Sequence, residues 1–312
     1  TVSVSMFREQ MRFLSVQHIP VVSMADALAA LDGKGNLPER AVVVTIDDGY
    51  ETALTKAWPV LHHFRFPFTL FVYPEAIGRH GSALTWDQLR FLQRHGVDIE
   101  SHSLTHPLLT HPGRAMSRLE YAAWLDHELA DSKKRLEDEL HQPVTVIAYP
   151  YGGYDERVVE RTRKAGYIAA LTCDDGDVTR FTDRLHLNRR LVFHRTTLKK
   201  YANYFDGRPL IVSDLEPRDG ERVSLPPERI SARIINWKSI LPDSVSVMVD
   251  KLGRRPLHGI FDPATGRLTI PLPPNHHHGY FFVSLTARDR EVPAIWHETT
   301  WLFIVKRNAS KN

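Results

Sequence analysis

The segment 41-AVVVTIDDGY-50 decides the fold and points to a site. Its first part, residues 41–46, is apolar or β-branched without polar alternation, which predicts a strand buried on both faces. Asp47 and Asp48 follow at the carboxyl end of that strand. Adjacent carboxylates repel each other and lose hydration unless a cation lies beside them, and a metal ion could bind one and leave the other as a base. A solvated Asp-Asp-Gly turn is the alternative that this segment leaves open.

The composition of the chain limits its class. With 312 residues, 42% hydrophobic and 25% charged, it has room for one large and one smaller domain and the composition of a globular protein. Its formal charge of +3 is too small to argue for nucleic-acid or membrane binding, and no apolar run approaches a membrane span. The single cysteine, Cys173, excludes an intrachain disulfide. The start at Thr1, without a methionine or an apolar signal core, predicts a trimmed or mature form.

Predicted strands and helices alternate along residues 1–207. Strands are predicted at 41–46, 68–72, 97–101, 144–149, 167–171 and 190–193, and helices at 7–17, 23–31, 52–64, 85–95, 117–140, 155–165 and 197–204. This alternation predicts a parallel sheet with crossover helices, open or closed into a barrel. In such folds the chemistry gathers at the carboxyl ends of strands, where Asp47, Asp48, His102 and Tyr151 fall.

The pattern changes at 206-DGRP-209. Beyond it, β-rich runs alternate with turns that contain proline or glycine, and these runs lie at 230–235, 245–249, 268–270, 280–285 and 300–305. Short strands at this spacing predict an all-β sandwich of about 100 residues. We therefore expect two domains, residues 1–207 and residues 208–312.

Two histidines follow another predicted strand. His102 and His106 stand at i and i+4, and on one helical turn that spacing suits two ligands of one divalent ion. With an aspartate of the first segment they supply two imidazoles and a carboxylate and leave positions open for water and substrate. Solvated loop histidines are the alternative. The turn 148-AYPYGG-153 could present a backbone N–H and an aromatic wall to a cleft, as stabilisation of an oxyanion requires, or it could be a plain turn.

Three motifs together resemble a known family. In their order and spacing, 45-TIDDGY-50, 102-HSLTH-106 and 148-AYPYGGYD-155 resemble the first three motifs of the NodB-homology polysaccharide deacetylases, carbohydrate esterase family four. The flanking segment 84-LTWDQL-89 agrees with this pattern. The resemblance covers about residues 4–205. It implies a distorted (β/α) barrel and metal-dependent N- or O-deacetylase activity.

The resemblance implies roles for the matching residues. Asp48, His102 and His106 would bind the metal, Asp47 would be the general base, and the N–H of Tyr151 would help the metal to stabilise the oxyanion. The implied cofactor is one divalent ion, zinc first, with cobalt, nickel or iron as alternatives. The implied partner is an acetylated glycan polymer or oligomer. The implied location is extracytoplasmic: periplasmic, secreted or in the cell envelope.

Later positions depart from the family pattern. Many members carry an arginine that holds the base at the head of the third motif, where this chain has Ala148. Arg189 or Arg190 could replace it. The fourth motif has no clean match beyond the acidic segment 173–177. His194, in the region of the fifth motif, is the candidate general acid, with a surface or packing histidine as the alternative.

The surroundings of the motifs supply further candidates. Trp86 and Pro150, with Tyr151, could line the substrate groove, and a tryptophan packed just after its helix cap is the alternative for Trp86. The helical residues 126–128 are predicted to be solvated. The histidines at 276–278 lie in a turn, and we assign no metal site to them.

The altered later motifs resemble the branch that de-N-acetylates poly-β-1,6-N-acetylglucosamine, which is the expected substrate. Deacetylation of chitin oligomers, peptidoglycan or acetylxylan is the enzymatic alternative, because groove loops set the linkage that is accepted. An inactive glycan-binding or scaffold protein is the alternative of another class. The second domain resembles bacterial immunoglobulin-like modules, and it could contact glycan or another protein.

Overall fold

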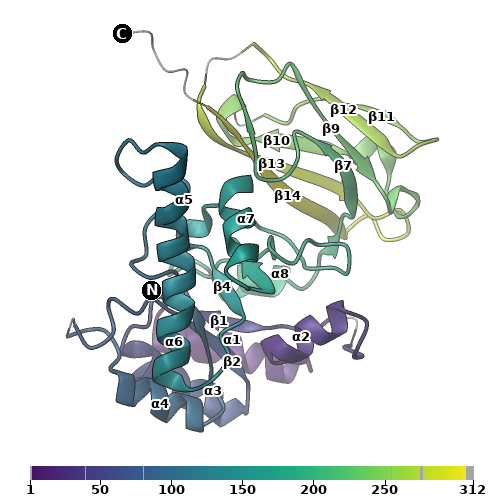
Figure 1. Cartoon of the computed structure of the whole chain (residues 1–312). Helices are drawn as coiled ribbons and strands as arrows, with labels where there is room; N and C mark the ends of the chain where they lie inside the picture. Colours follow the sequence, from purple (N-terminus) through teal and green to yellow (C-terminus); the bar gives the residue numbers. More distant parts are fainter. Residues whose placement is uncertain (1, 39, 80, 254, 275–276, 307–312) are drawn as a thin grey trace.

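The computed structural model describes residues 2–38, 40–79, 81–253, 255–274 and 277–306 (Figure 1). A parallel sheet with helices around it forms the N-terminal part, and antiparallel sheets form the C-terminal part (Figure 1). The predicted α/β class with a curled, barrel-type parallel sheet is therefore confirmed. The outer ends of the two predicted domains and His276 lie outside the described residues. None of the described helices is long and apolar enough to cross a bilayer.

Five parallel strands form the framework of the N-terminal part. They are β1 (Val44–Ile46), β2 (Phe68–Val72), β3 (Asp98–Ser101), β4 (Val146–Ala148) and β5 (Ala169–Leu171). Their order in the sheet is their order in the chain. Because each strand is added on the same side of a twisted sheet, the sheet curls toward a barrel and has no point where the strand order reverses. All the carboxyl ends therefore face the same way, toward the candidate site.

Helices connect and cover these strands. They are α1 (Val4–Val16), α2 (Met24–Leu31), α3 (Trp58–Phe64), α4 (Trp86–Arg94), α5 (Arg118–Asp126), α6 (Ser132–Leu140), α7 (Glu156–Lys164) and α8 (Leu198–Asn203). Capping boxes at Thr85 and Ser117 begin α4 and α5, where the sequence predicts helix starts. The predicted helix 52–64 starts with a π-helical turn, Ala53–Ala57, just ahead of Pro59, whose missing N–H cannot join the α-helical ladder.

Some of the predicted strands are shorter in the structure, and one is absent from it. The first is limited to Val44–Ile46 and is half-buried, because β1 is an edge strand of the sheet with a neighbour on one side. The strand predicted at 190–193 is wrong, since those residues have no regular structure. Just ahead of residues 190–193 the chain makes one isolated bridge, Leu171 to Leu187. The side chains of Arg189 and Arg190 then pair with Asp47 and Asp177.

Two sheets form the C-terminal part. One contains β10 (Ser246–Val249), β13 (Gly279–Arg288), β14 (Trp296–Val305) and β6 (Arg208–Pro209), with β8 (Glu221–Val223) also on β14; the other contains β11 (Ile260–Asp262), β12 (Arg267–Pro271), β9 (Arg229–Ile234) and β7 (Val212–Glu216). Buried residues of both sheets, such as Ile230 and Phe281, share one core. The predicted β-rich runs are confirmed as β9, β10, β12, β13 and β14.

Strand β14 contributes to two cores. Leu302 and Ile304 pack in the core of the N-terminal part, whereas Trp301, Phe303 and Val305 pack in the core between the C-terminal sheets. Successive side chains of a strand point to opposite faces, so the alternation divides them between the two cores. The end of β14 is consequently buried on both faces, and the strand joins the two parts of the chain.

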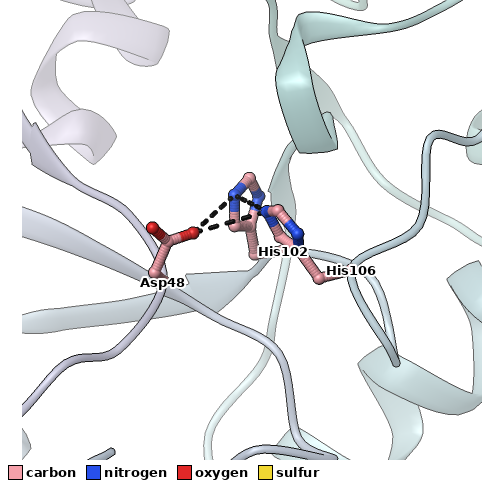
Figure 2. Close-up of side chains that lie close together, drawn as sticks. All are labelled: Asp48, His102 and His106. Atoms are coloured by element: carbon pink, nitrogen blue, oxygen red, sulfur yellow. Dashed lines mark hydrogen bonds and ion pairs between the residues drawn. The ribbon is translucent and has the colours of Figure 1, made fainter. Parts of the chain in front are cut away.

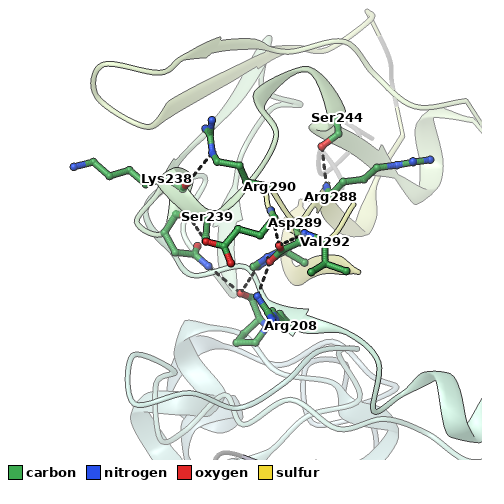
Figure 3. Close-up of polar contacts among 12 residues, drawn as sticks. Arg208, Lys238, Ser239, Ser244, Arg288, Asp289, Arg290 and Val292 are labelled. Carbon is green, nitrogen blue, oxygen red and sulfur yellow. Dashed lines mark hydrogen bonds and ion pairs between the residues drawn. The ribbon is translucent and has the colours of Figure 1, made fainter. Parts of the chain in front are cut away.

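A polar cluster fixes the chain where it enters the C-terminal part (Figure 3). Asp289 Oδ2 accepts a hydrogen bond from Arg208 Nη1 at 2.7 Å and lies 2.9 Å from His297 Nε2, while Oδ1 accepts from the N–H groups of Glu291 and Val292. The hydrogen bonds, that from Val292 first, lower the pKa of Asp289 to about 2. The carboxylate therefore stays ionised and ties β6 to the turn between β13 and β14.

A buried acid cluster lies between the two parts of the chain. Tyr154 Oη is 2.7 Å from Asp174 Oδ2 and 2.7 Å from Asp219 Oδ1, and His186 Nδ1 is 3.1 Å from Asp219 Oδ2. A phenol has one proton and can donate to one of the two carboxyls, so the second short contact requires a proton on a carboxyl group. Burial, together with the charge of Asp219, accordingly raises the pKa of Asp174 to about 7.

This cluster should make the folded chain less stable as the pH rises. A carboxyl with a raised pKa binds its proton more tightly in the folded state, so stability is lost from the unfolded pKa of about 4 up to about 7. Asp174→Asn can still hydrogen-bond the Tyr154 hydroxyl, through its amide N–H or its oxygen, and cannot ionise. We expect it to raise the Tm at pH 8 by about 2–4 °C relative to the parent, with little change at pH 5. The exposed control Asp206→Asn should follow the parent at both pH values, and an unchanged Tm for Asp174→Asn at pH 8 would contradict a protonated carboxyl.

Candidate active site

The two adjacent aspartates leave β1 in a left-handed turn. Asp48 has φ 77° and Gly49 has φ 70°, so the backbone turns sharply where the strand ends. A side chain at Gly49 would place its Cβ 3.0 Å from Val72 Cγ1, at the end of the neighbouring strand β2. Glycine is therefore required here both by the backbone conformation and by the close approach. The turn leaves Asp47 and Asp48 at the carboxyl end of the sheet.

The two histidines lie in the loop that follows β3. Residues 102–106 are not helical, contrary to the helical turn that the spacing suggests, and both Ser103 and His106 have positive φ, 61° and 62°. The hydroxyl of Ser103 accepts the His106 N–H at 3.1 Å. The N–H of His102 donates to the carbonyl of Val72 at 2.8 Å. These bonds turn both rings to the same side without a helix.

The hydrogen bond of His102 fixes its tautomer. Nδ1 lies 2.7 Å from the carbonyl oxygen of Ala148, which can accept but not donate, so Nδ1 carries a proton, and the lone pair of the neutral ring is on Nε2. Such a bond from the second ring nitrogen is what orients histidines that bind metals. Burial, and then the neighbouring His102, lower the pKa of His106 and favour its neutral form. Both rings are thus prepared as ligands.

Three side chains converge on one point (Figure 2). The Nε2 atoms of His102 and His106 are 3.1 Å apart, and Asp48 Oδ1 lies 3.5 Å and 3.4 Å from them. Atoms that each bind Zn²⁺ tetrahedrally at about 2.0–2.2 Å lie about 3.3–3.6 Å apart. The donor set and its spacing therefore fit one divalent ion. Among the described residues, Asp48, His102 and His106 are the group of histidine, cysteine or acidic side chains close enough together to hold a metal ion.

A buried glutamate shapes the histidine loop. The carboxylate of Glu128 accepts the N–H groups of Leu104 and Thr105 at 3.1 and 3.0 Å and the Thr105 hydroxyl at 2.7 Å. Its side chain is 2% exposed, so the prediction that residues 126–128 are all solvated is wrong for this residue. The π-helical segment His127–Asp131 interrupts the α-helical register here, which a search for helical periodicity misses.

Loss of this carboxylate should weaken metal binding. Glu128→Met keeps the volume but leaves two buried N–H groups without an acceptor, so the loop that carries both ligand histidines should loosen. We expect a 10- to 100-fold loss of metal affinity, about the size seen when a residue that supports a metal ligand is removed. Glu128→Gln retains one acceptor oxygen and should keep most of the affinity, as should the exposed Glu160→Gln on α7. Competition with a chelator measures this, and a Glu128→Met protein with parental affinity would contradict it.

Asp47 is held by an arginine from a distant segment. Arg189 Nη1 donates to Asp47 Oδ1 at 2.8 Å, and Arg189 Nε donates to the carbonyl of Thr172 at 2.9 Å. Burial alone would raise the pKa of Asp47, but Arg189 and then His102 outweigh it and hold that pKa below its ordinary value. Of the two arginines predicted to stand in for the missing one at Ala148, Arg189 is the one in contact. Arg190 instead pairs with Asp177 at 3.0 Å and with Glu298.

Tyrosines surround the three converging side chains. The ring of Tyr151 stands 4.8 Å from that of His106 and is 69% exposed, and its backbone has φ 58°. The ring of Tyr73 lies 5.1 Å from the ring of His106. Burial raises the pKa of Tyr73, and the nearby Tyr50 and Asp48 add to the rise. Sequence reasoning missed Tyr73, although it directly follows β2 and so obeys the same strand-end rule that found the others.

Three other predicted site residues lie outside this convergence. Pro150 is buried in the 3₁₀ turn that carries Tyr151. Trp86 is half-buried and packs against the core of the N-terminal part, as its alternative interpretation has it. His194 lies in an exposed turn, 193–196, closed by hydrogen bonds between Phe193 and Thr196. Roles for these residues in binding or proton transfer stay predictions.

Comparison with known proteins gives a consistent family. The sequence model of the polysaccharide deacetylase family matches residues 34–170. The chain is 31% identical over 185 residues to the YxkH protein of Bacillus subtilis (strain 168), covering 59% of this chain and 62% of that protein. It is 24% identical over 237 residues to the poly-β-1,6-N-acetyl-D-glucosamine N-deacetylase of Escherichia coli (strain K12), covering 65% of this chain and 35% of the relative. The chain thus spans less than two thirds of both relatives.

Solved structures share the fold. The Streptococcus pyogenes deacetylase PplD in complex with acetate superposes with a TM-score of 0.59 at 22% identity, covering 65% of this chain and 87% of that one. IcaB from Ammonifex degensii superposes with a TM-score of 0.59 at 24% identity, covering 65% and 89%. The family match thus identifies a polysaccharide deacetylase domain over residues 34–170, and the solved structures share its fold.

Proposed function

We propose that this chain is a metal-dependent polysaccharide N-deacetylase that acts on the N-acetylglucosamine units of poly-β-1,6-N-acetylglucosamine. The observation that carries the proposal is the convergence of Asp48, His102 and His106 beside an aspartate held by Arg189. The relatives of Escherichia coli (strain K12) and Staphylococcus aureus (strain N315) are named for this activity. We further propose the division into residues 1–207 and 208–312, with an immunoglobulin-like second domain, and a location outside the cytoplasm.

The mechanism follows from the position of each group. A divalent ion held by Asp48, His102 and His106 would polarise the acetyl carbonyl and lower the pKa of a water molecule. Asp47 accepts the proton of the attacking water through Oδ2, because Oδ1 is occupied by Arg189. The positive charge of that arginine keeps Asp47 ionised before the reaction.

The remaining steps concern the substrate. The Tyr151 N–H donates to the oxygen that becomes negative when water attacks the carbonyl, and the ring of Tyr151 forms one wall of the substrate site. Cleavage of the C–N bond releases acetate and leaves an amine on the sugar, which must receive a proton. His194 is the candidate donor, and its exposed turn would have to close over the substrate.

The test is release of acetate from defined oligomers. The protein is stripped with a chelator, resupplied with zinc, cobalt, nickel or iron, and given β-1,6-linked or β-1,4-linked N-acetylglucosamine oligomers. We expect metal-dependent release from the β-1,6-linked oligomers. Release from β-1,4-linked oligomers alone would favour chitin or peptidoglycan as the substrate, and release from acetylxylan would favour an O-deacetylase. A protein that binds metal and releases nothing from any of these would favour a glycan-binding scaffold.

A further inference from the structure

The C-terminal sheet touches three loops that carry residues of the proposed active site. Tyr280 Oη is hydrogen-bonded to the hydroxyl of Thr110, in the loop after β3 that carries His102 and His106. In the loop after β5, Thr300 Oγ1 donates to the carbonyl oxygen of Asp175 at 2.5 Å, and Glu298 pairs with Arg190. In the loop after β4, a side chain at Gly153 would place its Cβ 3.4 Å from Tyr280 Oη.

The contacts of Glu298 matter most because of where Arg190 stands. Its neighbour Arg189 holds Asp47, and the segment that carries both arginines has no regular structure. The backbone there is tied by the N–H of Arg189, which donates to the carbonyl of Asp174 at 3.0 Å. Arg190 is 16% exposed and lies between Asp177, from its own loop, and Glu298, from β14. The segment that carries Arg189 is thus also anchored, through Arg190, to the other part of the chain.

The anchor itself belongs to a stiff element. Glu298 is paired with Thr286 of β13 on one side and with Pro209 of β6 on the other, and Thr300 is paired with Ser284. The far end of the same strand is buried on both faces. A strand fixed in this way can hold a loop without regular structure in place, because movement of the strand would disrupt two neighbouring strands and two cores.

We propose that Glu298 and Thr300 of β14 are positioning residues that hold Arg189 against Asp47, so that the C-terminal sheet is a working part of the deacetylase. This inference rests on the proposed function for its catalytic consequence. Its structural consequence, the placement of Arg189, can be measured without any substrate. It assigns the C-terminal part a role other than linking or glycan binding.

The single cysteine supplies the reporter. Cys173 Sγ lies 3.8 Å from Arg189 Nη2, and the chain has no other thiol. Burial raises the pKa of the Cys173 thiol, and the positive charge of Arg189 limits that rise. When Arg189 moves away, the thiolate loses this support. The pH midpoint of Cys173 alkylation should then move upward.

The experiment compares two variants of the full chain. Glu298→Met with Thr300→Val removes both contacts to the loop after β5, and Glu216→Met removes a matched carboxylate that pairs with Arg267 within the C-terminal part. In the first variant we expect the alkylation midpoint of Cys173 to rise by about half a pH unit or more, and kcat to fall about tenfold while KM and metal affinity stay near parental values. Glu216→Met should match the parent in all four quantities.

The outcomes separate the possibilities. A Cys173 midpoint at the parental value would overturn the proposal, whether or not kcat or the Tm has fallen, because the contacts would then only join the two parts. If the parent protein releases no acetate, the proposed function is contradicted. The pH midpoint of Cys173 alkylation would still decide whether β14 holds Arg189 in place. If the double variant unfolds, Glu298→Met alone, which leaves the Thr300 contact in place, is measured in the same way and judged by the same outcomes.

Discussion

Asp47→Asn is expected to bind metal as tightly as the parent and to lose about 100- to 10,000-fold in kcat, the usual contribution of a general base. Asparagine has the same shape and can still accept from Arg189 through its amide oxygen, so the local structure should survive. It cannot take a proton from water. The aspartate lies 4.0 Å from His102 Nε2 and outside the three converging ligands, so metal affinity should change by less than a few-fold.

The measurement pairs acetate release with metal titration on the same protein sample. Arg189→Lys is a useful second variant. Lysine keeps the positive charge, but it cannot donate to the Thr172 carbonyl and to Asp47 at the same time, as arginine does. We expect it to reduce kcat less than Asp47→Asn does. An Asp47→Asn protein with parental turnover would mean that another group is the base.

Asp48→Ala should lose metal affinity, which Asp47→Asn keeps, because it removes a proposed metal ligand and not the proposed base. Two histidines with Nε2 atoms 3.1 Å apart would remain, without the carboxylate that neutralises the ion. We expect metal affinity to fall by more than about 100-fold, beyond the loss seen when a residue that supports a ligand is removed. Activity should fall with it and return in part at high metal concentration.

Chelator competition and activity as a function of metal concentration measure this. Asp47→Asn is the matched control, since it removes a neighbouring carboxylate charge and leaves the three ligands intact. Parental metal affinity in Asp48→Ala would place the ion elsewhere. Loss of activity with full metal occupancy would instead give Asp48 a role in chemistry.

Local patterns in the sequence predict much of this structure because they encode local physics. The side chains of Thr85 and Ser117 each accept a backbone N–H of the following helix, and both positions begin a helix with a capping box in the structure. Asp48 and His102 each follow a parallel strand, which predicts that they lie at the same edge of the sheet. In the structure Asp48 Oδ1 and His102 Nε2 are 3.5 Å apart. A β-branched run or a capping residue determines its own conformation, so it can be interpreted without knowledge of the fold.

The parts that sequence reasoning missed depend on distant contacts. Which of two neighbouring arginines reaches Asp47 is set by how the segment after Leu187 crosses the end of β1, and no local pattern records it. Glu128 is buried because a π-helical segment turns it inward to accept two N–H groups of the histidine loop. The strand predicted at 190–193 failed for a similar reason, since the Leu191 carbonyl accepts from the Tyr204 hydroxyl and the Phe193 N–H donates to the Thr196 hydroxyl instead of to a neighbouring strand.

The way β14 divides its side chains between two cores has a consequence for how the molecule comes apart. Leu302 and Ile304 cannot leave the N-terminal core while Trp301 and Phe303 stay in the other one, because they are neighbours on one strand. Heat or denaturant should therefore melt both parts in a single cooperative transition, seen alike by fluorescence and by circular dichroism. Two separate transitions would mean that each part holds together alone. A protein shortened after Gly207 should aggregate, because the apolar surface that receives β14 would face water.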